Sequence, residues 1–238
     1  MKYLDLPLPT PQENLACDEA LLNECEEGQE QEILRFWESS RYFVVLGHAG
    51  KAASEANLAS CRAANIPVLR RSSGGGTVMQ GPGCLNFSLL LKIPAWGPLS
   101  SITQTHAFVL QRHKEALLPL VGAEITVEAN DLALGKKKFS GNAQRRKRRF
   151  LLYHGTFLHR FDLSLIPRFL RMPAKQPAYR LNRSHEQFLI NLNIPPRAIQ
   201  EALKQAWNCT GVSDEVPREK ISRLAQEVYA ADAWNFKF

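Results

Sequence analysis

Apolar residues recur with helical spacing in the first part of the chain. Those between residues 17 and 25 fall at i, i+3, i+4 and i+8, the spacing of one buried face of a helix. Thr10, Pro11 and Glu13 have the order of an N-cap, a first helical residue and the closing residue of a capping box. Gly28 has the position of a C-terminal stop. The pattern predicts one amphipathic helix between Thr10 and Gly28.

Short runs of β-branched and apolar residues predict a series of strands. The predicted strands are residues 33–37, 42–46, 66–69, 85–91, 124–128, 131–134, 137–143 and 150–158. We expect the first two to form a hairpin, because only a short polar turn separates them. A short helix is expected at residues 55–64, and a capping box at Ser101 and Gln104 predicts a longer helix to about Leu118.

The last third of the chain returns to helical spacing. Helices are expected at residues 163–170, 199–206 and 221–228. Runs of strands with helices at the edges favour an α+β fold, with mixed β-sheets flanked by helices, over an alternating βαβ fold. The proline-rich residues 173–177 are the expected border between a core, residues 1–178, and a short helical C-terminal tail, residues 179–238, that packs on it.

Size and composition fit one large domain. Of the 238 residues, 45% are hydrophobic, enough for a sizeable core. The five cysteines are odd in number and lack CxxC spacing, which favours reduced thiols over disulfides or a zinc site. No stretch approaches the roughly 18 apolar residues of a membrane span. The N-terminus lacks the apolar run of a signal peptide, so we expect a cytoplasmic protein with no membrane partner.

The formal net charge of +7 comes from one segment. Residues 136–149 hold eight basic residues and no acidic one, and the remaining 224 residues carry a net charge of −1. A nucleic-acid binder usually spreads positive charge over several elements, so nucleic acid is not the expected partner. The basic run at residues 145–149 is interpreted as a solvated loop or a docking site for an acidic protein, with nucleic acid as the less favoured alternative.

The segment RRSSGGGT, residues 70–77, has the composition of an anion-binding loop. Its glycines can direct backbone N–H groups into one concavity, and Arg70 and Arg71 offer planar forks for phosphate or carboxylate. It lacks the GK[ST] ending of a Walker A loop. The alternative interpretation is a flexible turn with solvated arginines.

Lys138 is the candidate catalytic cation. An ammonium group there, just before Ser-Gly, can lie near a carboxylate and a phosphate at once and lower their repulsion. A basic hairpin tip is the alternative, and the favoured interpretation for Lys136 and Lys137. His154 and Gly155 lie side by side in a predicted strand, and without further context a structural histidine is the simpler reading of that pair.

Other catalytic arrangements have less support. The sequence contains no GxSxG or HExxH motif. No cysteine lies between Cys84 and Cys209, so a Cys–His pair around His154 would need distant parts of the chain. Asn130 and Asp131 offer oxygen ligands that could help to hold a Mg²⁺ ion carried by a nucleotide.

Eight segments, in this order, resemble the lipoate–protein ligase A family within the biotin/lipoate ligase and octanoyltransferase superfamily. They are NLACDEAL from Asn14, LRFW from Leu34, VVLG from Val44, RRSSGGGTVMQ from Arg70, LNFS from Leu85, NDL from Asn130, KKFSGNAQR from Lys137 and HGTFL from His154. They span roughly residues 15–158, about 60% of the chain.

The resemblance implies the mixed-sheet α+β catalytic domain of biotin and lipoyl ligases and a two-step reaction. Lipoate and Mg·ATP would form lipoyl-AMP, and a specific lysine of an acceptor lipoyl domain would then receive the lipoyl group. ATP, Mg²⁺ and lipoate are the implied ligands. Lys138 matches the lysine that contacts both the lipoyl carboxyl oxygen and the phosphate.

Further binding residues carry over to matching positions of this chain. For ATP or lipoyl-AMP they are Arg70, Arg71, Ser73, Gly74, Gly75, Gly76, Thr77, Val78, Met79, Asn130, Asp131, Lys138, Ser140 and Gly141. For the lipoyl pocket they are Gly75, Gly76, His154 and Gly155. Asp131 is the expected Mg²⁺ contact, through the nucleotide.

Three features depart from the family pattern. The usual Gly-x-x-Gln/Asn after the second strand appears as Gly47-His48-Ala49-Gly50. Met79 and Gln80 stand where the family usually has an aromatic residue and a histidine. The residues after Ala178 are too few and too helical for an ordinary accessory domain, so a separate accessory subunit is a candidate partner for the activation step. The alternatives are a cysteine-dependent octanoyl or lipoyl transferase between carrier proteins, and a non-enzymatic basic adaptor that binds acidic protein or RNA.

Overall fold

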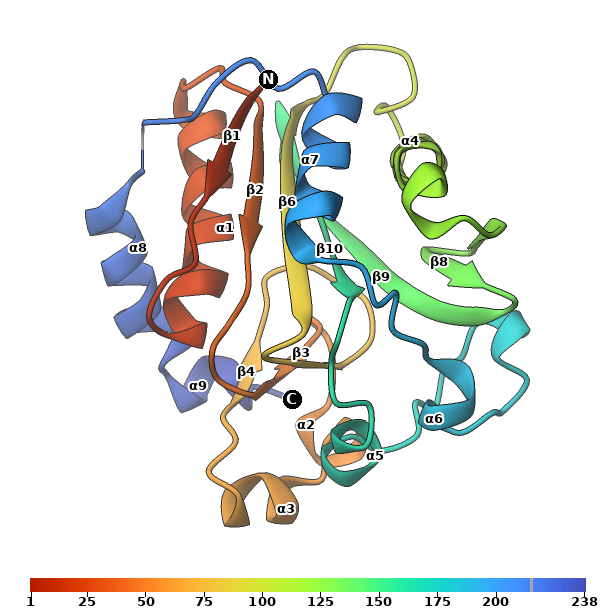
Figure 1. Cartoon of the computed structure of the whole chain (residues 1–238). Helices are drawn as coiled ribbons and strands as arrows, with labels where there is room; N and C mark the ends of the chain where they lie inside the picture. The colour runs from red at the N-terminus through yellow and green to blue at the C-terminus, as the bar shows by residue number, and fades with distance from the viewer. Residues whose placement is uncertain (215) are drawn as a thin grey trace.

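A mixed seven-stranded sheet runs through the middle of the computed structural model, which describes residues 1–214 and 216–238 (Figure 1). Its order is β1 (Lys2–Asp5), β2 (Ile33–Trp37), β6 (Cys84–Lys92), β10 (Phe150–Leu158), β9 (Lys137–Arg146), β8 (Asp131–Leu134) and β7 (Ile125–Glu128). Within this sheet, β1 and β2 pair in parallel and all other neighbouring strands are antiparallel. Strand β10 lies at the centre and pairs along its length with β6 and β9.

A second, three-stranded sheet has the order β4 (Val68–Arg70), β3 (Phe43–Leu46) and β5 (Val78–Gln80). The hairpin expected for residues 33–46 is therefore wrong, because β2 and β3 belong to different sheets. Both strands are buried at every position. A strand that is buried at every position is stable between two neighbours, and β2 has β1 and β6 while β3 has β4 and β5.

Helix α1 (Pro11–Glu27) has both predicted ends. The hydroxyl of Thr10 accepts a hydrogen bond from the Glu13 amide at 3.2 Å, and the Glu13 carboxylate accepts one from the Thr10 amide at 3.0 Å. Gly28 follows the last turn with a φ of 140°, which few other residues adopt. The apolar face of α1 covers one side of the large sheet, where Leu21 and Leu152 belong to one buried cluster.

The predicted helix at residues 55–64 is two short helices, α2 (Ala52–Glu55) and α3 (Leu58–Ala63). They are separate because Asn57 starts α3 as its N-cap, with its side chain accepting from the Ser60 amide at 3.4 Å. Helix α4 (Ile102–Val121) begins after the predicted cap, Ser101, and runs three residues beyond the expected end.

The C-terminal third is helical, as expected. Its elements are α5 (Leu165–Phe169), a 3₁₀ turn η1 (Ala178–Arg180), α6 (His185–Phe188), α7 (Pro196–Ala206), α8 (Arg218–Leu224), a π turn η2 (Ala225–Tyr229) and α9 (Asp232–Asn235). Helix α7 packs beside α4, whereas α8 and η2 pack on α1 (Figure 1). Helices from this region thus cover both faces of the large sheet. Among the described residues, no helix is long and apolar enough to cross a bilayer.

Candidate functional site

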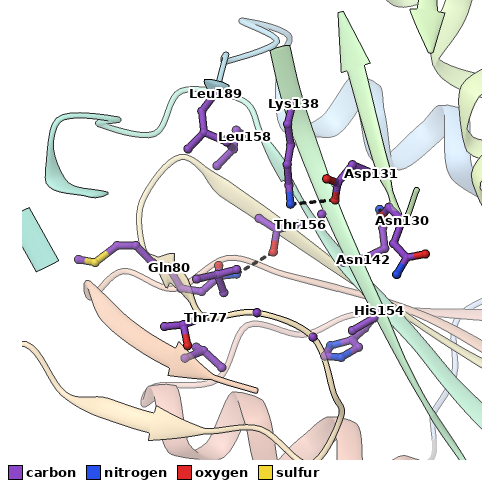
Figure 2. A pocket seen from close by; sticks show the side chains of 18 of the residues that line it. Thr77, Gln80, Asn130, Asp131, Lys138, Asn142, His154, Thr156, Leu158 and Leu189 are labelled. Carbon is purple, nitrogen blue, oxygen red and sulfur yellow. Dashed lines mark hydrogen bonds and ion pairs between the residues drawn. The ribbon is translucent and has the colours of Figure 1, made fainter. Parts of the chain in front are cut away.

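A cavity of about 350 Å³ lies between the two sheets. Its walls come from the glycine loop, defined as residues 70–77, from β5, β6, β9 and β10, and from residues 171–189. Figure 2 shows Thr77 and Gln80 on one side, and Lys138, Asp131 and Asn130 on the other. The segments singled out in the sequence therefore meet at one place.

Arg71 gives the glycine loop its shape. Its guanidinium is buried and donates to the carbonyl oxygens of Gly74 at 2.5 Å and Gly76 at 2.9 Å, and to the Ser73 hydroxyl at 3.1 Å. Burial lowers the pKa of Arg71 to about 10, with Glu55 acting in the opposite direction, so the side chain stays charged at neutral pH. The partly negative carbonyl oxygens of the loop therefore hold the charged Arg71 guanidinium beside the cavity.

Arg70 points away from the cavity. Its guanidinium donates to the carbonyl oxygens of Gly47 at 3.0 Å, Gly50 at 2.7 Å and Asn235 at 2.8 Å. It therefore fastens the C-terminal helix α9 to the segment after β3. Of the predicted binding residues, and within residues 1–214 and 216–238, those outside the cavity lining are Arg70, Ser73, Gly74 and Ser140. The other predicted residues line it.

Lys138 contributes an ammonium group to the cavity wall. Its Nζ lies 2.8 Å from Oδ1 of Asp131 (Figure 2), and the other oxygen of Asp131 accepts a hydrogen bond from the Tyr179 hydroxyl at 2.7 Å. Gly141 makes room for the lysine, because a Cβ at that position would lie 2.6 Å from Nζ. The Lys138 side chain is 24% exposed, so a ligand in the cavity can reach it.

Asn142 joins two walls of the cavity. Its amide nitrogen donates to the Asn130 carbonyl at 2.8 Å, which links β9 to the turn before β8. The side chain occupies space that Gly155 leaves free, because a Cβ on Gly155 would lie 2.1 Å from Oδ1 of Asn142. Asn142 was not among the predicted site residues, although it lies in the KKFSGNAQR segment.

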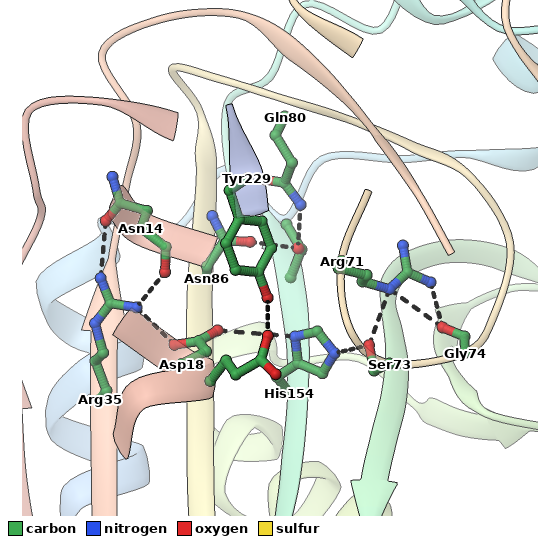
Figure 3. A network of polar contacts seen from close by, with 12 residues as sticks. Asn14, Asp18, Arg35, Arg71, Ser73, Gly74, Gln80, Asn86, His154 and Tyr229 are labelled. Carbon is green, nitrogen blue, oxygen red and sulfur yellow. Dashed lines mark hydrogen bonds and ion pairs between the residues drawn. The ribbon is translucent and has the colours of Figure 1, made fainter. Parts of the chain in front are cut away.

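A buried polar network connects the glycine loop to β10, α1 and β2 (Figure 3). The Ser73 hydroxyl lies 2.6 Å from Nε2 of His154, and Nδ1 of His154 lies 3.9 Å from Asp18, which is paired with Arg35 at 2.6 Å. Burial lowers the pKa of His154 to about 4, so the ring is neutral at pH 7. These are the residue types of a nucleophilic triad, but Ser73 is 1% exposed and lies outside the cavity lining. The network therefore positions the loop.

The rest of the cavity wall is mostly apolar. Its apolar side chains include Leu15, Trp37, Val45, Val78, Met79, Phe87, Phe139, Leu158 and Leu189. Gln80 stands where the family usually has a histidine. It donates to the Thr156 hydroxyl at 2.7 Å, and Thr156 donates to Asn86 at 2.6 Å. An apolar cavity with a few fixed polar groups is typical of sites for small amphipathic ligands.

Residues 10–207 match the family model described as the lipoyl protein ligase A/B catalytic domain. The chain belongs to this family. Lipoate–protein ligase 1 from Staphylococcus aureus is 30% identical over 95% of this chain and 70% of its own length. Octanoyltransferase LipM from Brevibacillus brevis is 24% identical over 99% of this chain and 98% of its own length. The lipoyl ligase family is a family of enzymes, and the resemblance inferred from the motifs is confirmed.

Solved structures of lipoyl ligases have the same fold. A lipoate–protein ligase A bound with ATP matches with a TM-score of 0.81 and 23% identity, over 99% of this chain and 98% of that one. A bipartite lipoate protein ligase from Thermoplasma acidophilum, studied with its E2 lipoyl domain, matches with a TM-score of 0.80 and 23% identity, over 99% and 95%. The predicted mixed α+β ligase fold is confirmed.

No thiol reaches the cavity of this lipoyl ligase family member within the described residues. Cys84, the first residue of β6, is fully buried, and burial raises the pKa of its thiol far above the usual range. A thiol that stays protonated and covered is a poor nucleophile. Cys84 therefore serves as a packing residue.

The basic segment is not the solvated loop expected from the sequence. Arg145 pairs with Glu19 at 2.7 Å, and Lys147 donates to Asn23 at 2.6 Å, so β9 and the following turn lie against α1. Arg149 pairs with Glu30 at 2.5 Å. That expectation is wrong for Arg145 and Lys147, because α1 presents acidic and polar side chains to them. The pair of Arg149 and Glu30 is exposed and lies beyond the end of α1.

Proposed function

We propose that this chain transfers a lipoyl group, activated as lipoyl-AMP, to a lysine of an acceptor lipoyl domain. The supporting observation is that one cavity contains both the ammonium group of Lys138 and apolar walls such as Trp37 and Phe87. A mixed anhydride with an apolar tail needs a cation at its reacting end and a dry slot for the tail.

The residues of the site suit both steps of such a reaction. In the first, a carboxylate oxygen of lipoate attacks the α-phosphorus of ATP and pyrophosphate leaves. Two anions must meet there, and the Lys138 ammonium lowers their repulsion. In the second, the neutral ε-amine of the acceptor lysine attacks the acyl carbon, the bond to the phosphate oxygen breaks, AMP leaves and the amine proton passes to solvent. The same ammonium opposes the charge that grows on the leaving phosphate.

Mg²⁺ fits this cavity as an ion carried by the triphosphate. Both oxygens of Asp131 already have partners, Lys138 and Tyr179. Within the part of the chain that the structure describes, no group of three His, Cys, Asp or Glu side chains could hold a metal. Mg²⁺ often keeps several waters and binds through substrate phosphates. Asp131 would then contact the ion through the nucleotide or a water.

We also propose that the activation step uses a separate accessory subunit. The T. acidophilum ligase is described as bipartite, and the match covers 95% of that chain. The residues that serve the transfer step, Lys138 and the glycine loop, belong to the chain described here. Transfer from preformed lipoyl-AMP therefore needs only this chain and the acceptor.

The similarity to an octanoyltransferase supports a second candidate, acyl transfer through a cysteine thioester. The absence of a cysteine from the cavity lining, within residues 1–214 and 216–238, argues against it. The two candidates differ in whether a thiol is needed, and octanoate and lipoate differ in the length and bulk of the tail.

Mass spectrometry of an acceptor lipoyl domain tests the proposal. With lipoyl-AMP and this chain, the acceptor should gain one lipoyl group, and a parallel reaction with octanoyl-AMP gives the acyl preference. Blocking every thiol should leave the rate largely intact, because no thiol lines the cavity among the described residues. Complete loss of transfer after blocking, together with an acyl thioester on the untreated chain, would establish the transferase instead.

A further inference from the structure

Residues 171–189, called the covering segment here, follow α5, include α6 and cross one side of the cavity. Pro173, Lys175 and Pro177 from this segment line the cavity. Its far end is joined to the strand that carries the catalytic candidate, because Leu189 pairs with Lys138 in a β-bridge and the Ile190 amide donates to the Lys138 carbonyl at 3.0 Å. The backbone of Lys138 is thus part of the anchor of this segment.

Tyr179 makes a second connection between the covering segment and the site. Its hydroxyl donates to Oδ2 of Asp131 at 2.7 Å, across 48 residues of sequence. Its ring packs against Phe188, with the centroids 5.1 Å apart, and its carbonyl accepts from Arg183 at 2.8 Å. Arg183 also donates to the Lys136 carbonyl at 2.9 Å. The tyrosine is therefore held from two sides in one orientation.

The Asp131 carboxylate stands between Tyr179 and Lys138. The side chain is 9% exposed, so water contributes little to its hydrogen bonding. Oδ2 accepts from Tyr179 and Oδ1 faces the Lys138 ammonium at 2.8 Å. A carboxylate that is fixed at one oxygen cannot rotate freely at the other, and a charge-assisted hydrogen bond is directional. The hydroxyl thus limits the positions open to the ammonium group.

We propose that Tyr179 is a positioning residue, which directs the Lys138 ammonium through Asp131 and so makes its orientation depend on the covering segment being closed over the cavity. This inference rests on the proposed role of Lys138. It assigns Tyr179 no contact with the reacting atoms. With the covering segment displaced, Asp131 loses its second partner, and the ammonium loses the fixed carboxylate that aims it.

A double-mutant cycle separates this role from simple fastening of the covering segment. The variants are Tyr179→Phe, Asp131→Ala and the double variant, and the rate measured is transfer from preformed lipoyl-AMP to a lipoyl domain at saturating acceptor. Tyr179→Phe should slow transfer about tenfold, the size expected for losing one hydrogen bond to a charged group. In the Asp131→Ala background the same substitution should change the rate less than about twofold, because coupling through Asp131 is already lost.

Tyr42→Phe is the matched control. Tyr42 packs edge-on against Phe161 and lies outside the cavity lining of the described residues, so this variant should transfer at the wild-type rate. Trypsin cleavage after Lys175, an exposed residue of the covering segment, gives a second measurement that needs no turnover. Tyr179→Phe and Asp131→Ala should raise its rate by similar factors, because each removes one partner of the same hydrogen bond.

Three outcomes overturn the inference. A wild-type rate for Tyr179→Phe shows that the hydroxyl positions nothing. An equal loss in both backgrounds shows that Tyr179 acts independently of Asp131. Faster cleavage in Tyr179→Phe but not in Asp131→Ala shows that the hydroxyl fastens the segment through a partner other than Asp131. If the wild-type chain itself transfers nothing from lipoyl-AMP, the proposed function fails first, and this inference fails with it.

Discussion

At the scale of single residues, side chains with no group for the chemistry keep the charged groups in place. Asn142, Tyr179 and Arg71 each hold a carbonyl or a carboxylate beside the cavity. Lys138 and Asp131 were candidates from their motifs and from the family resemblance, and both line the cavity. Tyr179 was not, because its partner is 48 residues away and nothing local marks the contact.

Gly155 should tolerate no side chain. In Gly155→Ala the methyl group would meet Oδ1 of Asn142 at 2.1 Å and the Gly141 carbonyl at 2.8 Å, so Asn142 must leave its place. We expect the dissociation constant for a lipoyl-AMP analogue, measured by calorimetry, to be at least about tenfold larger than in wild type. The free energy of unfolding should fall by about 1–3 kcal/mol. Gly211→Ala is the control, since it meets only the flexible end of Lys2. Equal affinity in Gly155→Ala and wild type would contradict the account of this wall.

His154 should make the fold sensitive to acid. Burial lowers its pKa from 6.5 to about 4, so between those values the unfolded chain binds a proton that the folded chain does not. The neutral, buried ring contributes fully to the free energy of unfolding above pH 6.5. As the pH falls from 6.5 to about 4, this contribution is lost, which lowers the free energy of unfolding by up to about 3 kcal/mol. Urea unfolding of wild type and His154→Gln across this range checks it. A parallel pH dependence in the two proteins would contradict the shift.

At the scale of elements, the site depends on contacts between segments that are distant in sequence. Periodicity and capping residues predicted α1, β8 and β10 with their bounds, because those signals are local. They could not predict which sheet β3 joins, because that is decided by β4 and β5 far along the chain. The role of Arg70 was missed for the same reason: its partners in α9 lie about 165 residues away.

Asn235 in α9 should stabilise the start of the glycine loop. Its oxygen accepts from the Arg70 amide at 2.9 Å and its amide donates to the Tyr229 carbonyl at 2.9 Å, both in a buried setting. Asn235→Ala leaves those groups without partners, and we expect a loss of about 2 kcal/mol by urea unfolding. The exposed Asp232→Ala, in the same helix, should change stability by less than about 0.5 kcal/mol. Equal stability of the two variants would refute this anchor.

At the scale of the whole molecule, the cavity between the two sheets gives this lipoyl ligase fold its amphipathic site. Family membership was predictable, because eight motifs occurred in order. The division into a core of residues 1–178 and a C-terminal tail stays a prediction. The helices after residue 178 pack on α1 and α4, so they contribute to the same hydrophobic clusters as the core.

Activation and transfer should differ in this chain. Given the accessory-subunit proposal, we expect acceptor modification from preformed lipoyl-AMP to be at least about tenfold faster than from ATP, Mg²⁺ and lipoate, a difference of about 1.4 kcal/mol in barrier. Both rates can be followed by acceptor mass in one assay. Equal rates in the two assays would mean that this chain activates lipoate without help, and would end the accessory-subunit proposal.

The most direct measurement is the rate at which Lys138→Ala moves the lipoyl group from preformed lipoyl-AMP to a lipoyl domain. A preorganised charge of this kind is worth about 3 kcal/mol or more, so the rate should fall by at least about a hundredfold. Lys137→Ala is the matched control, because this neighbour is exposed and lies outside the cavity lining of the described residues. It should stay near the wild-type rate. A Lys138→Ala variant that transfers as fast as Lys137→Ala would contradict the account.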